Sequence, residues 1–304
     1  MGQTAHVTGT NEGASELEWE REWPPRTSIL VLAFAGYFDA ASAATGAVDH
    51  LIEFTGATRL ATIDGDPFFD AQQVRPHVVL EGGVTRTIVW PENTIHANAS
   101  LADDGTDAGR ELVLLSGIEP HYAWRRFTDL VVEVAQHTGA QVVVTLGAMP
   151  AQVPHSRMPL VHASSASPEI AQRFGLARPR YQGITGIVGT LQAALDHLGL
   201  PAISMQVGVP YYAAGAQNWK ASAALLRNLE HVTGIPTGHG LLHERVVEWE
   251  QLVDEAVAEN PEASGYLPQL EAEYDRQATE QLPSSDDLAA EFERYLRELD
   301  DPPS

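Results

Sequence analysis

The chain has 304 residues, of which 44% are hydrophobic and 19% charged, and it contains no cysteine. This composition is typical of a globular protein, and it excludes disulfides, thiolate metal sites and cysteine nucleophiles. Eighteen basic residues against 41 acidic ones give a net charge of −23, which repels nucleic acid and excludes it as a partner.

Nothing in the sequence indicates a membrane or secretory segment. The longest strictly apolar run, residues 29–35, is far shorter than the ~20 residues that span a bilayer. The first 26 residues lack the basic start and the apolar stretch of a signal peptide. We therefore expect a cytoplasmic protein with no membrane partner.

Residues 1–26 are polar and end at Pro24-Pro25, which predicts a tail whose Trp19 and Trp23 can dock on the body. The run SILVLAFA at 28–35 is typical of a strand buried on both faces. A helix over 39–54 follows, with Asp39 as its cap and Gly56 after its end.

Strands and helices then alternate along the chain. This order predicts an α/β protein with a three-layer, mostly parallel mixed sheet covered by helices on both sides. We expect strands at 59–63, 111–115, 141–146, 158–163 and 202–207, a hairpin of 78–81 with 85–90 around Gly82-Gly83, and helices at 121–137, 186–197 and 217–232.

After Gly240 the strand patterns stop and the chain becomes strongly acidic. Residues 241–304 hold four arginines and eighteen acidic residues. Apolar residues at helical spacing predict one helix near 242–257, a second segment near 267–274 and a last helix near 285–299. We divide the chain into a tail (1–26), an α/β core (27–240) and an acidic helical C-terminal extension (241–304).

Standard catalytic and cofactor motifs are absent. The sequence has no P-loop, no G-x-S-x-G elbow and no dinucleotide fingerprint, since Gly183, Gly186 and Gly189 are spaced differently. His239 and His243 have the spacing of a metal pair, but a solvated helix entry is the better interpretation. We expect no metal, no cofactor and, on balance, no enzyme.

Ligands of open α/β sheets bind beyond the carboxyl ends of the strands. That rule selects Gly36 and Asp39 after one strand, and Gly147 and Met149 after another. Asp39 is more often a cap than a catalyst.

The loop that follows holds His155, a potential acid or base, and Arg157, a potential clamp for a carboxylate or phosphate. An ordered loop whose side chains only bond backbone carbonyls is an equal alternative. Thr185 and Gly186 open a helix whose amides can hold an anion, or else allow close helix packing.

Four blocks of sequence carry a family resemblance: AFAGYFDAASAATGAVDHL, ELVLLSGIEPHYAWRRF, LGAMPAQVPHSRMP and GITGIVGTLQAALDHLGLPAISMQVGVPYY. In this order they resemble the proteasome assembly chaperone 2 family, most closely its actinobacterial branch. The resemblance implies a phosphorylase- or hydrolase-like α/β fold, a homo-oligomer with a trimer favoured, and proteasome core subunits as partners. It supplies no catalytic residues.

Two functions follow as hypotheses. The first is a non-catalytic assembly or scaffold protein that forms a homo-oligomer. The second is a small-molecule-binding sensor or enzyme that uses the cleft at the strand ends.

Overall fold

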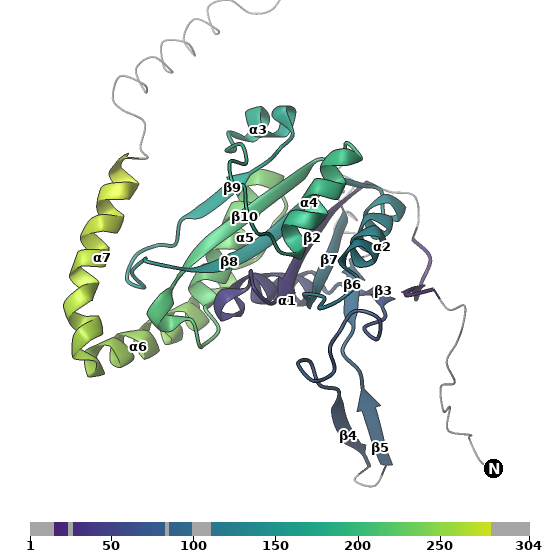
Figure 1. Ribbon diagram of the computed structural model, residues 1–304. Coiled ribbons are helices and arrows are strands. Elements are labelled where there is room, and N and C mark those ends of the chain that lie inside the picture. The colour runs from purple at the N-terminus through teal and green to yellow at the C-terminus, as the bar shows by residue number, and fades with distance from the viewer. Residues whose placement is uncertain (1–14, 24–26, 83–84, 99–110, 281–304) are drawn as a thin grey trace, which may run out of the picture.

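The computed structural model describes residues 15–23, 27–82, 85–98 and 111–280. An eight-stranded sheet runs through it in the order β1-β3-β6-β7-β2-β8-β10-β9, with helices on both faces (Figure 1). Its strands are β1 (Leu17–Trp19), β2 (Ser28–Ala35), β3 (Thr58–Ile63), β6 (Asn93–Ala97), β7 (Glu111–Ile118), β8 (Ala140–Ala151), β9 (Val161–Ser164) and β10 (Ala202–Pro210).

The centre of the sheet is parallel and its flanks are antiparallel. Strand β2 pairs in parallel with β7 and β8, and β8 pairs in parallel with β10. The remaining pairs, β1–β3, β3–β6, β6–β7 and β9–β10, are antiparallel. The predicted three-layer mixed α/β fold is confirmed.

Two apolar cores hold the helices on the sheet. Along β2, Leu30 and Leu32 enter the core beneath helices α2 (Trp124–His137) and α4 (Ile187–His197). Their neighbour Val31 enters the opposite core, beneath α1 (Ala43–Thr55) and α5 (Trp219–Thr233). A strand with helices on both sides needs apolar residues at every position, which explains the unbroken run of β2.

The N-terminal segment differs from the prediction of a polar tail. Strand β1 pairs with β3 at the edge of the sheet. The docking expected of both tryptophans is confirmed: the Trp23 indole donates to the Thr138 carbonyl at 3.2 Å, and the Trp19 ring lies 4.0 Å from that of His137. Because only the Leu17 side chain of this strand is buried, no apolar alternation marks it in the sequence.

Strands β4 (His77–Glu81) and β5 (Thr85–Val89) form the predicted hairpin as a separate two-stranded sheet. The hairpin projects from one end of the molecule, away from the helical layers (Figure 1). We call residues 77–90 the arm. The sequence did not predict strand β6 or the short helix α3 (Pro168–Phe174).

The acidic C-terminal region forms α6 (His243–Glu259) and α7 (Pro261–Glu280). Trp249, Val253 and Val257 of α6 make a small third apolar cluster. The last predicted helix, near 285–299, lies outside the described residues, and the division at residue 240 stays a prediction. In the part of the chain that the structure describes, no helix is long and apolar enough to cross a membrane.

Candidate functional site

The Asp39 carboxylate binds the start of helix α1. Oδ1 accepts hydrogen bonds from the amides of Ala44 (2.8 Å) and Thr45 (3.2 Å), and Oδ2 accepts one from the Thr45 hydroxyl (2.5 Å). Burial raises the pKa of Asp39, and these hydrogen bonds partly oppose that rise. The geometry is that of a helix cap.

The carboxylate of Glu119 lies between the end of β2 and the start of α4, where it binds backbone amides of both segments. Glu119, just past β7, accepts hydrogen bonds from the Tyr37 and Ile187 amides, each at 3.0 Å. A Cβ at Gly36, whose φ is +154°, would lie 2.7 Å from Glu119 Oε2, and a Cβ at Gly186 would lie 2.9 Å from Oε1. Glycine at both positions therefore leaves room for this side chain.

Glu119 thus holds the place that the sequence suggested for a bound anion at Thr185 and Gly186. The Thr185 hydroxyl donates to the carbonyl of the next residue, Gly186, at 3.5 Å. Gly147 lies beside the Phe38 backbone, where the Ala148 amide donates to the Phe38 carbonyl at 2.7 Å. These contacts extend the pairing of β2 with β8 beyond the end of β2.

His155 is buried, with 2% of its surface exposed. Its Nε2 lies 2.8 Å from Asp254 Oδ1, and its Nδ1 lies 2.8 Å from the Tyr212 hydroxyl, which also accepts from the His155 amide at 2.9 Å. With a proton on Nε2, the ring donates to Asp254, and the contacts at Nδ1 and the backbone amide both involve the Tyr212 hydroxyl. Both ring nitrogens therefore have hydrogen-bond partners within the protein.

Arg157 is a carboxylate clamp, as its chemistry suggested, but the carboxylates belong to α7. Nε and Nη2 donate to the two oxygens of Asp275, each at 2.9 Å, and Nη1 donates to Glu271 at 3.1 Å. The hydrogen bond to Asp275 raises the pKa of Arg157, and the same bond lowers the pKa of Asp275.

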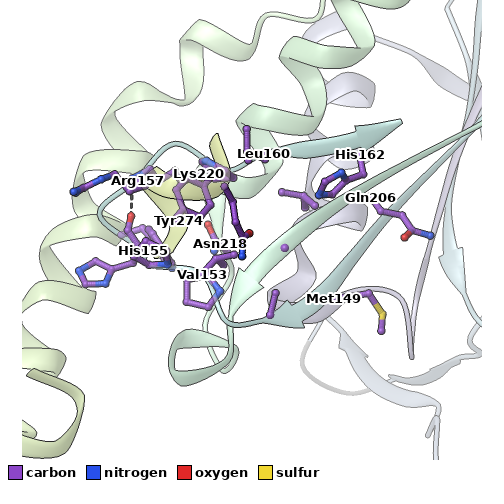
Figure 2. A pocket seen from close by; sticks show the side chains of 18 residues that line it. Met149, Val153, His155, Arg157, Leu160, His162, Gln206, Asn218, Lys220 and Tyr274 are labelled. Atoms are coloured by element: carbon purple, nitrogen blue, oxygen red, sulfur yellow. Dashed lines mark hydrogen bonds between the residues drawn. The ribbon is translucent and has the colours of Figure 1, made fainter. Parts of the chain in front are cut away.

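A pocket of about 280 Å³ lies where β8 and β10 end. The loop between β8 and β9 forms one wall and the first turn of α5 forms another, while Trp249 of α6 and Tyr274 and Gln277 of α7 complete the lining (Figure 2). The Tyr274 hydroxyl of α7 donates to the Met158 carbonyl and ties α7 to the loop. Three predicted residues, Met149, His155 and Arg157, line the pocket; Gly36, Asp39, Gly147, Thr185 and Gly186 do not.

Sequence reasoning missed several polar residues on the pocket wall, among them Asn218, Lys220 and Trp249. Lys220 donates to the His155 carbonyl at 2.6 Å and pairs with Glu250 at 2.5 Å. The available signal was that Lys220 is the one lysine of the chain and follows an asparagine with the position of a helix cap.

The histidine pair at the start of α6 does not converge on a metal site. The His239 Nδ1 lies 3.2 Å from Glu230 Oε2 and also near the Thr237 hydroxyl. Among the described residues, no group of three or more His, Asp or Glu side chains has the arrangement of a metal site.

Comparisons with known proteins agree on one family. The profile of the PAC2 family matches residues 33–257. A PAC2 family protein from Streptomyces avermitilis is 36% identical, with a TM-score of 0.72, over 79% of this chain and 99% of that one.

A proteasome-assembly chaperone homologue from Mycobacterium tuberculosis is also 36% identical, with a TM-score of 0.69 over the same shares of the two chains. An archaeal proteasome activator from Pyrococcus furiosus shares the fold at 17% identity, with a TM-score of 0.61 over 79% of this chain and 97% of that one. A search of curated proteins finds no match. Helix α7, which begins at Pro261, lies beyond the matched profile.

Proposed function

The chain belongs to the PAC2 family, and from that premise we propose that it is a homo-oligomeric assembly chaperone that binds proteasome core subunits in the cytoplasm and catalyses no reaction. The relative described as a proteasome-assembly chaperone homologue supports this function. We favour a trimer, which the resemblance of the sequence blocks implies.

The observation that carries the proposal is the apolar surface of the arm. Among the described residues of the arm, the large apolar ones are between 45% and 59% exposed: Val78, Val79, Leu80, Ile88, Val89 and Trp90. The strand register places Val78, Leu80 and Ile88 on one face. A lone two-stranded hairpin is at best marginally stable in water, so a protein partner that covers this face would stabilise it.

The charge of the arm also suits a protein contact. Residues 77–90 contain one acidic and one basic side chain, in a chain of net charge −23. Most of the surface of this protein repels other acidic proteins, whereas the arm does not. An apolar, neutral projection is therefore the part of the molecule best suited to hold another protein.

The candidate polar side chains already bind other groups of the protein, which supports a role without catalysis. His155 binds Asp254 and Tyr212, Arg157 binds α7, and Glu119 binds two backbone amides. A general acid or base must reach its substrate through a free ring nitrogen or oxygen. His155 would have to break a hydrogen bond first.

The second candidate function is that of a small-molecule-binding sensor or a phosphorylase- or hydrolase-like enzyme. The pocket beneath α7 favours it, because that pocket lies beyond the ends of β8 and β10, where ligands of α/β sheets bind. An enzyme would turn over its substrate, whereas a sensor or chaperone would only bind one.

Affinity purification of the tagged chain from the organism that encodes it tests the first function. We expect proteasome α and β subunits to be enriched over a tag-only control. The triple variant V78S/L80S/I88S should lose them, and the matched variant T85S/T87S, on the opposite face of the arm, should retain them. Equal enrichment in the tag-only control would refute the function.

A further inference from the structure

The pocket beneath α7 is surrounded by buried polar side chains that have unused hydrogen-bond donors. Asn218 is 1% exposed, Trp249 is 4% exposed and Lys220 is 7% exposed. All three line the pocket, and Figure 2 labels Asn218 and Lys220 among its lining side chains. A buried N–H without an acceptor is costly, so it marks a place where an acceptor binds.

The donors can be counted one by one. The Asn218 Oδ1 accepts from the Ala221 amide at 2.9 Å, which fixes the orientation of the side-chain amide. Its Nδ2 is therefore the other group, and no described residue accepts a hydrogen bond from it. The Trp249 Nε1 is buried and likewise has no acceptor among the described residues. The Lys220 ammonium gives two of its three protons to the His155 carbonyl and to Glu250.

The backbone adds a positive potential at the same place. Helix α5 has 15 residues and begins at Trp219, between Asn218 and Lys220. The amino end of a helix carries a partial positive charge and favours an anion. Donors and helix together therefore select an acceptor of negative charge.

The charge balance limits that acceptor to a single negative charge. Glu250 already neutralises Lys220, and the two carboxylates of α7 already neutralise Arg157. A doubly charged phosphate would find no free cation, whereas a single carboxylate needs only the amide, the ammonium proton and the helix end. The rest of the wall is mixed: its polar side chains are His162, Gln206, Tyr274 and Gln277, and its larger apolar ones are Met149, Val153, Pro154, Leu160, Val207 and Pro210.

We propose that this pocket binds a small molecule that has one carboxylate on an apolar body, with the carboxylate at Asn218 and Lys220. The volume of about 280 Å³ suits a body of a few carbon atoms. Such a group occurs in a free branched acid and in the C-terminal residue of a peptide. Helix α7 contributes Tyr274 and Gln277 to the pocket wall. The site does not depend on the chaperone function.

Isothermal titration calorimetry with 4-methylpentanoate tests the site, with 4-methylpentanamide as the uncharged control. N-acetyl-leucine, which represents a peptide C-terminus, distinguishes the two sources of the carboxylate. The titrations use the full chain and also the variant E271Q/D275N, in which α7 is held less firmly. We expect one of the two carboxylates to bind at least tenfold more tightly than the amide.

Two variants locate the binding. Asn218→Asp keeps the cap acceptor for Ala221 but replaces the donor by a second negative charge, so it should weaken binding at least tenfold. Leu160→Trp fills the pocket without touching the cap, and it should abolish binding while the melting temperature is retained. Asp196→Asn, on α4 and outside the pocket, should bind as the unchanged chain does. The proposal would be overturned if neither the unchanged chain nor E271Q/D275N bound a carboxylate, or if the acid and the amide bound equally.

Discussion

Arg157 and Asp275 lie 118 residues apart and form a two-point ion pair, in which Nε and Nη2 of the guanidinium each contact one carboxylate oxygen at 2.9 Å. This pair fastens α7 to the loop between β8 and β9. Glu271 strengthens the attachment, because it accepts from both Arg157 and the Ser156 hydroxyl. The described part of the acidic C-terminal extension therefore packs on the core through the loop that the sequence singled out.

Arg157→Ala should loosen α7 without unfolding the core. Because the ion pair is solvent-exposed, its effect on global stability should be small. The amides of α7 should exchange at least fivefold faster with deuterium, while those of β2 and β8 keep their rates. Arg276→Ala, which removes a contact to Glu273 within α7, is the matched control. Equal exchange of α7 in the Arg157 variant and the unchanged chain would contradict the attachment.

Asp39 should make folding depend on pH in a defined direction. Burial raises its pKa above the ordinary value of 3.8, so the folded chain holds this proton more tightly than the unfolded chain. The contribution of Asp39 to the free energy of unfolding therefore falls as the pH rises from 3.8 through the raised pKa.

Asp39→Asn keeps the acceptor for the Ala44 amide and lacks the titration. The difference in unfolding free energy, unchanged chain minus variant, should decrease as the pH rises through this window. Urea denaturation at a series of pH values measures it. An increase with pH would show that the pKa of Asp39 is lowered instead.

Glu119 should be structural. Glu119→Ala leaves the Tyr37 and Ile187 amides without their acceptor and should lower the free energy of unfolding by about 1 to 3 kcal/mol. Glu119→Gln retains an acceptor oxygen and should cost less. Chemical denaturation compares the two variants, and equal stability of Glu119→Ala and the unchanged chain would remove Glu119 from this role.

The central fold was predictable because its strands carry their own signal. In β2 and β10 nearly every side chain is buried, and mainly apolar runs, unbroken from Ile29 to Ala35 in β2, are typical of strands covered on both faces. Strand β6 was not predicted because it has only five residues and polar Asn93 holds one of its buried positions, which leaves Ile95 and Ala97 as its only apolar residues. Its burial comes from β3 and β7, which no local pattern encodes.

The site was predictable only in part, for the same reason. The position of His155 and Arg157 beyond β8 follows from the rule about strand ends. Their partners Asp254 and Asp275 lie on helices about a hundred residues away, and only tertiary packing selects them from eighteen acidic residues. The anion predicted at the start of α4 is likewise a side chain of the protein, the carboxylate of Glu119, which lies 68 residues from Ile187 in the sequence.

The proposed homo-oligomer should persist at high salt. Copies of net charge −23 repel one another, so their contacts must be apolar or lie away from the acidic faces. Screening at ~0.5 M salt weakens the repulsion more than such contacts. Sedimentation velocity at low and high salt measures the mass. Dissociation in high salt would indicate an ionic interface and contradict an apolar one.

Native mass spectrometry of the purified chain mixed with purified proteasome α and β subunits tests the chaperone function most directly. We expect a complex of the proposed homo-oligomer with proteasome subunits, and its loss in V78S/L80S/I88S while the variant stays folded by circular dichroism. If the unchanged chain forms no complex with either subunit, separately or together, the proposed chaperone function is wrong.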